Sequence, residues 1–546
     1  MKKVTLMMVL TTVILSGCGN TEAQKEKKST CATEMQTKVD EFAPVKLTTD
    51  LSVLTEKERQ ILPILIDVAK IMDELFWMQA FGNKADLDKI EDPCMKDFAI
   101  INYGPWDRLD GMKPFVPGYG EKPLGANFYP HDMTKEEFEQ LDDPNKDGLY
   151  TIIVRNEAGA LEVVWYKDYY KMHLDKAIAL MEKAIELAED AGLKNYLQLR
   201  VEAFKTDDYF ASDMAWMDMK DSRIDFVVGP IENYEDRLFG YKTAYEAFVL
   251  VKDEKWSNDL EKFTKMLPEL QTNLPCDPKF KQEIPGSESD LNVYDAIYYG
   301  GDCNSGSKTI AINLPNDERV HLQKGARRLQ LKNSMKAKFD IILMPIAAMM
   351  IDESQLDNIK FDAFFSNVTF HEVAHGLGIK NTINGKGNLR EALKEQYSAW
   401  EEAKADILGL FMVEYLVEKG EITNCTAEDA YATFIAGILR SVRFGASSAH
   451  GQANMMAYNF FEDKGAFTRT ETGKYLIDFD KSREALKEWS ALILEIEGEG
   501  KYDFAKQYNN ENGKIRPSLQ ADLDKINSAG IPRDIRFEQG TTALGY

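Results

Sequence analysis

The chain is organised around one stretch, Thr369-Phe370-His371-Glu372-Val373-Ala374-His375-Gly376-Leu377-Gly378. His371 and His375 are four positions apart, and in a helix residues at that spacing share one face. Two imidazoles on one face can bind a single metal ion, and Glu372 lies beside them, where a carboxylate can take a proton from water. The whole chain has only six histidines. We therefore interpret the pattern as part of a zinc site, rather than as two incidental histidines on a helix.

Two histidines leave a zinc ion short of a third protein ligand. A long helix is predicted over 389–419, and it contains Glu401-Glu402-Ala403-Lys404-Ala405-Asp406. One face of this helix is small or apolar except for Glu402 and Asp406, and buried carboxylates are costly unless they are paired or bind a metal. We predict Glu402 as the third ligand and Asp406 as a hydrogen-bond partner of a ligand histidine. Glu401, on a neighbouring face near Lys404, is the weaker ligand candidate. We expect it, like Asp406, among the side chains that surround the metal ligands.

The composition describes an acidic protein with enough apolar residues for large cores. Asp and Glu number 90 against 66 Lys and Arg, so the formal net charge is -24, and 44% of the residues are hydrophobic. Nucleic-acid binding needs clustered Lys and Arg, so this charge argues against a nucleic-acid partner. The length of 546 residues is typical of two to four domains or of one large two-lobed body.

The amino terminus indicates export. Lys2 and Lys3 precede the apolar run 4–15, which is too short for a mature membrane span. The run ends in Leu15-Ser16-Gly17-Cys18, which resembles the bacterial lipobox, whose Cys becomes the lipid-carrying first residue of the mature protein. We predict a signal peptide over 1–17, lipid attachment at Cys18 and a flexible polar tether over 18–45. An ordinary cleaved signal peptide is the alternative.

The lipobox resemblance implies a location in the bacterial cell envelope. Gly19 after the Cys fits sorting to the outer membrane, and the side of the membrane that the protein faces is left open. The five other cysteines form no Cys-x-x-Cys pair, so no cysteine zinc site is predicted and no disulfide can be assigned. These cysteines are Cys31, Cys94, Cys276, Cys303 and Cys425.

Periodicity predicts a predominantly helical α+β fold. Helical spacing of apolar residues covers 55–81, 169–204 and 240–270, and almost all of the chain from 361 onward. A hairpin is predicted from 149–154 and 161–166, which alternate around the turn Asn156-Glu157-Ala158-Gly159. Short strands are predicted at 224–228 and from 309 onward.

His-Glu-x-x-His followed by Glu-Glu-Ala-Lys-Ala-Asp resembles the dipeptidyl peptidase III family, whose zinc motifs are His-Glu-x-x-x-His and Glu-Glu-Cys-Arg-Ala-Glu/Asp. Gly229-Pro230-Ile231-Glu232-Asn233-Tyr234 is similar to a family segment, which implies that Glu232 anchors the amino group of the substrate and Tyr234 stabilises the oxyanion. Ile312-Asn313-Leu314-Pro315-Asn316 is similar to the family's Asn-x-Pro-Asn strand, which implies that Asn313 and Asn316 hold the substrate's amino end. Ser448-Ala449-His450-Gly451 places His450 where the family has an additional active-site histidine.

The resemblance implies two lobes around a cleft. The lower, mixed α/β lobe with a small β-barrel would span 46–335, of which part of 255–290 is a candidate for the other lobe. The upper, helical zinc lobe would span 336–512, and 513–546 would return to the lower lobe. The implied activity is hydrolysis of short peptides with release of amino-terminal dipeptides, using one Zn2+ per chain and Glu372 as the base. A monomer tethered to the membrane through lipid alone is the default expectation.

Two positions depart from the family pattern. The metal motif has five residues from His371 to His375, where the family usually has six, and Asn454 stands where the family usually has Arg. Five residues suit an undistorted helix, so metal binding is still expected, while strict dipeptide release is left open. The alternatives are another zinc hydrolase on the same fold, such as an endopeptidase or a non-peptidase, a lipoprotein that binds peptides without cleaving them, and a purely structural surface protein.

Overall fold

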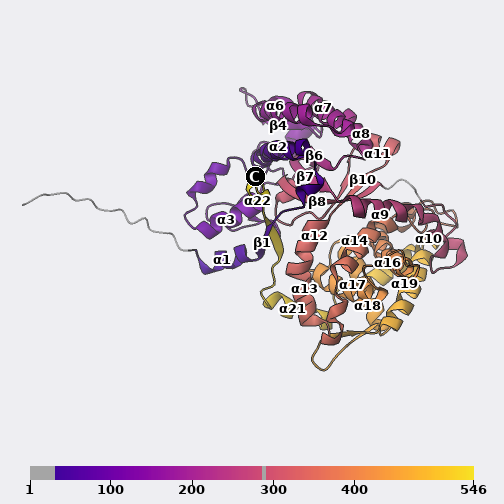
Figure 1. The fold of residues 1–546 in the computed structure, drawn as a ribbon. Helices are drawn as coiled ribbons and strands as arrows, with labels where there is room; N and C mark the ends of the chain where they lie inside the picture. Colours follow the sequence, from indigo (N-terminus) through magenta and orange to yellow (C-terminus); the bar gives the residue numbers. More distant parts are fainter. Residues whose placement is uncertain (1–30, 286–289) are drawn as a thin grey trace, which may run out of the picture.

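The computed structural model describes residues 31–285 and 290–546. The apolar side chains of these residues form two large cores, one running from Leu47 to Leu331 and the other from Leu260 to Ile531. In Figure 1 the helices α2, α6 and α7 lie with the main sheet in one half, and α13, α14 and α16 to α19 lie in the other. The predicted signal peptide, lipid site and residues 18–30 of the tether lie outside the described residues.

The main sheet has five strands in the order β6-β7-β8-β10-β9. Only the β8–β10 pair is parallel. The edge strands β6 and β9 approach each other where Asn316 Nδ2 donates to Ile231 O at 3.2 Å. The predicted barrel corresponds to this sheet, and its closure stays a prediction. The strands are β6 (Ile224–Glu232), β7 (Ala244–Lys252), β8 (Asp290–Gly301), β9 (Ala311–Leu314) and β10 (Arg327–Leu331).

The helix α2 (Glu56–Ala80) is the central helix of the first core. Thr55 and Glu58 form a capping box at its start, in which each side chain accepts from the backbone N–H of the other. The helix packs against β7 and β8 and beside α6 (Lys171–Leu187). A Cβ at Gly300 of β8 would lie 2.4 Å from Ala69 O, so this close approach requires glycine.

The second core consists of helices that surround α14 (Phe361–Ala374) and α16 (Tyr397–Glu418). The predicted helix over 389–419 is interrupted by a 3-10 turn between α15 (Leu389–Leu393) and α16. The other main helices of this core are α13 (Met344–Met350), α17 (Ala427–Ser441), α18 (Ala449–Asp463), α19 (Phe479–Glu499), α20 (Tyr502–Asn512) and α21 (Pro517–Ser528).

Smaller elements complete the described chain. They are α1 (Thr33–Asp40), β1 (Phe42–Lys46), α3 (Pro93–Asn102), β2 (Trp106–Asp107), β3 (Lys113–Pro114), α4 (Lys135–Gln140), β4 (Thr151–Arg155), β5 (Leu161–Trp165), α5 (Tyr166–Tyr169), α7 (Ala191–Thr206), α8 (Phe210–Asp218), α9 (Glu254–Lys265), α10 (Leu267–Asn273), α11 (Glu318–Lys324), α12 (Lys332–Lys338), β11 (Phe467–Arg469), β12 (Tyr475–Ile477), β13 (Asp534–Glu538) and α22 (Thr541–Leu544). The C-terminal β13 pairs in parallel with the N-terminal β1.

Most predicted elements are confirmed, including the helix from 56 to 80 and the β4–β5 hairpin. One prediction is wrong, because 244–252 is the strand β7 and not part of a helix. This strand lies between β6 and β8, and its residues are buried on both faces. Its sequence therefore lacks the alternation of apolar and polar residues that identifies a half-exposed strand. Within the span predicted as a tether, 31–45 contains α1 and most of β1.

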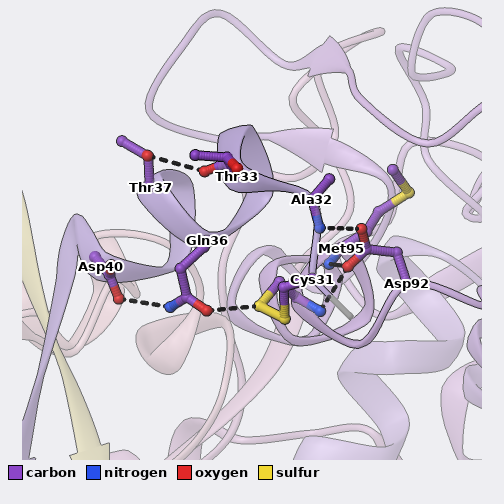
Figure 2. Close-up of a disulfide and its surroundings, with 9 residues drawn as sticks. Cys31, Ala32, Thr33, Gln36, Thr37, Asp40, Asp92 and Met95 are labelled. Atoms are coloured by element: carbon purple, nitrogen blue, oxygen red, sulfur yellow. Dashed lines mark hydrogen bonds between the residues drawn. A yellow bond between two sulfur atoms is a disulfide. The ribbon is translucent and has the colours of Figure 1, made fainter. Parts of the chain in front are cut away.

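A disulfide joins Cys31 to Cys94 and so attaches the start of α1 to α3, as Figure 2 shows. Ala32 N also donates to Asp92 Oδ2 at 2.9 Å, beside the disulfide. Cys276, Cys303 and Cys425 are free. Disulfides persist in exported proteins and are rare in the cytosol of mesophiles, so this bond agrees with the predicted export.

Removal of the disulfide is expected to destabilise the protein at the small apolar cluster of α1, β1 and α3, to which Cys94 belongs and against which Cys31 packs. For the double variant Cys31→Ser/Cys94→Ser we expect the free energy of unfolding to fall by about 2–4 kcal/mol, because the bond restricts the unfolded chain. Urea unfolding followed by circular dichroism measures this change. Cys276→Ser alters a free cysteine and is the matched control. Unfolding curves of the double variant and the control that coincide would contradict the prediction.

Candidate metal and peptide-binding site

The candidate metal site lies where α14 crosses α16. A Cβ at Gly409 would lie 2.7 Å from His371 N, so the absence of a side chain at this position lets the two backbones meet. His371 lies in the last turn of α14, and His375 is the residue that follows the helix. The crossing brings both histidines next to Glu402 on α16, and His371 next to Asp406.

Three imidazoles converge on one carboxylate oxygen. The distance from Glu402 Oε2 is 3.2 Å to His371 Nε2, 3.8 Å to His375 Nε2 and 3.2 Å to His450 Nε2. His450 comes from the first turn of α18, and its ring stacks on that of His371 with centroids 5.9 Å apart. The side chains predicted as ligands and the additional histidine therefore lie together, although 79 positions separate His371 from His450.

These donors fit a zinc ion. Zinc binds imidazole nitrogen at about 2.0–2.1 Å and carboxylate oxygen at about 2.0–2.2 Å, so tetrahedral ligands lie roughly 3.3 Å from one another. The observed separations of 3.2 and 3.8 Å bracket that value. Glu402 Oε2 is buried and has no hydrogen-bond partner of suitable geometry, and a bound cation would satisfy it. His371, Glu402 and His450 also form a group with one ligand atom from each within 4.8 Å.

A layer of carboxylates orients the two histidines of the motif. Asp406 Oδ1 is 2.7 Å from His371 Nδ1, as predicted, and Glu401 Oε1 is 2.8 Å from His375 Nδ1. With Nδ1 engaged in this way, each ring turns Nε2 toward Glu402. Asp406 Oδ2 accepts from Asn454 Nδ2 at 2.8 Å, and Lys404 Nζ donates to Glu401 at 3.0 Å.

The buried charges of this layer alter one another's pKa values. Burial opposes protonation of His371, but the charge and hydrogen bond of Asp406, together with the nearby Glu402 carboxylate, more than offset it and raise its pKa to about 10. Burial would raise the pKa of Glu401, yet Lys404 and His375 lower it to about 2. Glu402 likewise has a lowered pKa, because His371 and His450 outweigh its burial. These carboxylates therefore favour a positive charge at His371, either a proton or a bound cation.

The residues predicted to anchor the amino end of a peptide lie around two other cavities. Glu232, Tyr234 and Asn316 line both of them, and Asn313 lines one. Tyr234 is largely exposed, and burial raises the pKa of Glu232 while Asn316 opposes that shift. The cavity lined by Asn313, Glu246 and Asp302 has a volume of about 630 Å³, and the other about 380 Å³.

A third cavity of about 300 Å³, here called the metal cavity, is lined by His371, Glu372, Asp406 and His450. Ala311 of β9 lines both the metal cavity and the cavity of Asn313. The edge strand β9 therefore runs from the predicted amino-end anchors to the predicted metal ligands. Tyr234 does not line the metal cavity, so the structure does not bring it together with His450.

Three side chains at the site were not predicted. Arg328 of β10 donates to Glu372 O, Asn454 donates a hydrogen bond to Asp406, and Arg440 of α17 lines the metal cavity. Arg328 lies opposite Asn313 in the β9–β10 register and is half-buried, and an Arg on a strand carries no sequence signal of this role. The polar stripe that Asn454 shares with His450 was a usable signal for the second contact.

Comparisons with known proteins bear on this geometry. A sequence model described as "Peptidase family M49" matches residues 151–398. The solved structure of DPP III from Caldithrix abyssi has a TM-score of 0.87 and 38% identity, and the match covers 92% of this chain and 98% of that one. The dipeptidyl-peptidase III from Corallococcus sp. strain EGB has a TM-score of 0.74 and 37% identity, with 92% and 96% covered. Human dipeptidyl peptidase 3 is 23% identical over 67% of this chain and 50% of its own length.

One relative carries a different name. Nudix hydrolase 3 of Arabidopsis thaliana is 33% identical over 94% of this chain, and the match covers 74% of the plant protein. Part of the plant protein therefore lies outside the match, and its name describes the whole of that protein. The family match and both solved structures agree with a peptidase, as does the arrangement of His371, Glu372 and Glu402.

Proposed function

Since the chain belongs to peptidase family M49, the dipeptidyl peptidase III family, and is thus a peptidase acting on peptides, we propose that it is a zinc enzyme that releases amino-terminal dipeptides from short peptides. The observation that carries the zinc proposal is the convergence of histidine Nε2 atoms on Glu402 Oε2, a buried oxygen without a hydrogen-bond partner.

The proposed ligands are His371, His375 and Glu402. His371 and His375 each have Nδ1 held by a carboxylate, the arrangement that orients histidine ligands in zinc sites. His450 has no such carboxylate at Nδ1 among the described contacts, and its side chain is 64% exposed. We therefore place His450 next to the open coordination position, where substrate binds, rather than among the ligands.

A zinc ion in such a site would lower the pKa of water and polarise a carbonyl group. In the proposed reaction the Glu372 carboxylate accepts the proton of the attacking water and passes it to the leaving amine. Arg328 and the end of α14 fix the backbone of Glu372. His450, at the same cavity, donates to the oxygen that gains negative charge. Tyr234 joins it only if the two halves close over the substrate.

The amino end of the peptide is proposed to bind at Glu232. This carboxylate is half-buried and lines one cavity together with the exposed side chains of Asn313, on the edge strand β9, and Asn316, two residues after that strand. A peptide added along that edge would make strand-like hydrogen bonds with β9 while its ammonium group pairs with Glu232. The division into a lower lobe over 46–335 and an upper lobe over 336–512 is proposed with it, and the two separate cores support that division.

We also propose that the protein is exported and held at the cell envelope by lipid on Cys18. The Cys31–Cys94 disulfide, which begins thirteen positions after Cys18 in the sequence, supports an oxidising compartment. Within the described residues, every helix is too short or too polar to cross a bilayer. The lipid would then be the membrane attachment.

Removal of a ligand is expected to release zinc. Because the ligand set is complete only with His375, we expect His375→Ala to lower zinc affinity more than 100-fold, while His450→Ala retains stoichiometric zinc. Zinc content after dialysis against a weak chelator, measured by mass spectrometry, separates the two variants. Loss of zinc from His450→Ala with retention in His375→Ala would instead assign the metal to His371, Glu402 and His450.

The Glu372→Gln variant is expected to bind zinc normally and to lose turnover. The amide cannot accept a proton, so kcat on a dipeptidyl-arylamide should fall by about 10²–10⁴. Glu471→Gln, at an exposed position in the β11–β12 turn, is the matched control and should match wild type. Unchanged turnover in Glu372→Gln would contradict the proposed role of this carboxylate as the proton acceptor.

Dipeptide release requires a free amino group on the substrate. We expect acetylation of that group to lower kcat/KM by about 10–100-fold or more, because the charge-assisted pair with Glu232 is lost. Glu232→Gln should lower kcat/KM on the free-amine substrate by a similar factor and make acetylation nearly neutral. Equal cleavage of blocked and free peptides by wild type would indicate an endopeptidase.

A further inference from the structure

Arg440 is a cation without a partner at the end of the metal cavity. It comes from the last turn of α17 and lines the cavity together with His371 and Glu372. Within 31–285 and 290–546, no hydrogen bond or ion pair joins its guanidinium to another residue, and its Nε is buried with nothing to donate to. The guanidinium stacks on the ring of Phe364, 5.7 Å from the centroid.

The nearest acidic influence on Arg440 is Asp534, and that carboxylate is already engaged. Lys338 Nζ lies 3.0 Å from Asp534 Oδ1, and Ser307 Oγ and Lys308 N donate to Asp534 Oδ2. Burial lowers the pKa of Arg440 and Asp534 opposes that shift, but a guanidinium remains charged at neutral pH. A half-buried cation that lacks an anion gives up hydration without gaining a partner, and a bound anion would offset this cost.

The other charged groups of the cavity have roles at the metal. Asp406 is held by His371 and Asn454, and Glu372 is the proposed base. Apolar side chains line the cavity together with Arg440, among them Val368, Phe434 and Ile438. A guanidinium with aromatic and aliphatic neighbours favours a planar carboxylate, which it can bind in a bidentate manner.

The direction of the peptide identifies which carboxylate this is. The argument rests on the proposed function, in which the amino end binds at Glu232 and the chain follows β9 toward His371. Because Ala311 lines the metal cavity and Asn313 lines the neighbouring one, the residues after the cleaved bond enter the metal cavity. Its volume of about 300 Å³ lies at the lower limit of ligand pockets, which suits a short leaving segment.

We propose that Arg440 binds a carboxylate one or two residues beyond the cleaved bond. The preferred substrates are then tripeptides and tetrapeptides with a free carboxyl terminus. An acidic side chain at the first position after the cleaved bond is the second source of the same group. Arg440 is thus a specificity-determining residue for the leaving side of the substrate.

The test compares peptides that differ only in this carboxylate. The probes are Ala-Arg-Phe and Ala-Arg-Phe-Gly, each as free acid and as carboxyl-terminal amide, and Ala-Arg-Asp amide. For wild type we expect at least one acid to exceed its amide about tenfold or more in kcat/KM, since a charge-assisted pair is worth this factor. In Arg440→Gln the ratio should fall to within twofold of one, and Arg440→Lys should lie between.

Arg390→Gln is the matched control. Arg390 also stacks its guanidinium on an aromatic ring, that of Tyr397 at 4.6 Å, but it does not line the metal cavity. Its acid-to-amide ratio should equal that of wild type. A wild-type ratio near one for both peptide lengths, or an unchanged ratio in Arg440→Lys and Arg440→Gln, would overturn the proposal. A high ratio for Ala-Arg-Asp amide over Ala-Arg-Phe amide assigns the site to the side-chain carboxylate.

Binding separates this inference from the proposed reaction. Calorimetric Kd values of the same peptides for the zinc-loaded Glu372→Gln protein do not depend on turnover, and the acid should again bind about tenfold more tightly. If wild type cleaves none of the peptides and yet the acid binds more tightly, the proposed reaction fails and the role of Arg440 stands. If peptides are cleaved and acid and amide bind equally, the role of Arg440 fails alone.

Discussion

The candidate site depends on the contact between the backbones of α14 and α16 at Gly409. A Cβ at this position would lie 2.7 Å from His371 N and 2.9 Å from Phe370 C, both backbone atoms that cannot turn aside. The approach sets the distance from the histidines to Glu402, and imidazole and carboxylate side chains are too short to compensate for a wider crossing. Ala399 and Ala405 lie about one turn before and one turn after Glu402, and both are buried in α16 as Gly409 is. Packing and ligand geometry are therefore fixed by one contact.

A hydrogen bond from the sheet reaches this crossing directly, in addition to the apolar contacts of Leu291 and Val293 of β8 with the second core. Glu372 belongs to the last turn of α14, whose carbonyl groups lack partners within the helix. Arg328 of β10 donates to Glu372 O, and it lies opposite Asn313 in the sheet. A cation at a helix carboxyl end is favoured by the helix dipole as well as by the hydrogen bond. The strand pair that presents the peptide anchors thus also holds the backbone of the proposed base.

The sequence predicted the features that local periodicity and spacing determine. His371, His375, Glu402 and Asp406 follow from helical faces, and the structure places them within contact of one another. Features that depend on packing between distant segments were not predictable. The strand 244–252 has no alternation, because both of its faces are buried, and the pairing of Cys31 with Cys94 depends on how α1 meets α3. Arg440 likewise lacks an ion-pair partner among the described residues, because the nearby Asp534 already pairs with Lys338.

The acidic layer behind the histidines makes the site ready for a cation. Asp406 and Glu401 engage the Nδ1 atoms, and Lys404, which pairs with Glu401, supplies one positive charge against these two carboxylates and so offsets only part of their negative charge. Without a metal, the same field draws a proton onto His371, whose pKa is raised to about 10. A proton and a divalent ion then compete for one nitrogen, and the ion has the advantage that it also reaches Glu402 Oε2, which the proton leaves without a well-aligned partner. The carboxylates placed behind the histidines therefore favour metal binding through the same charges that perturb the ion-free site.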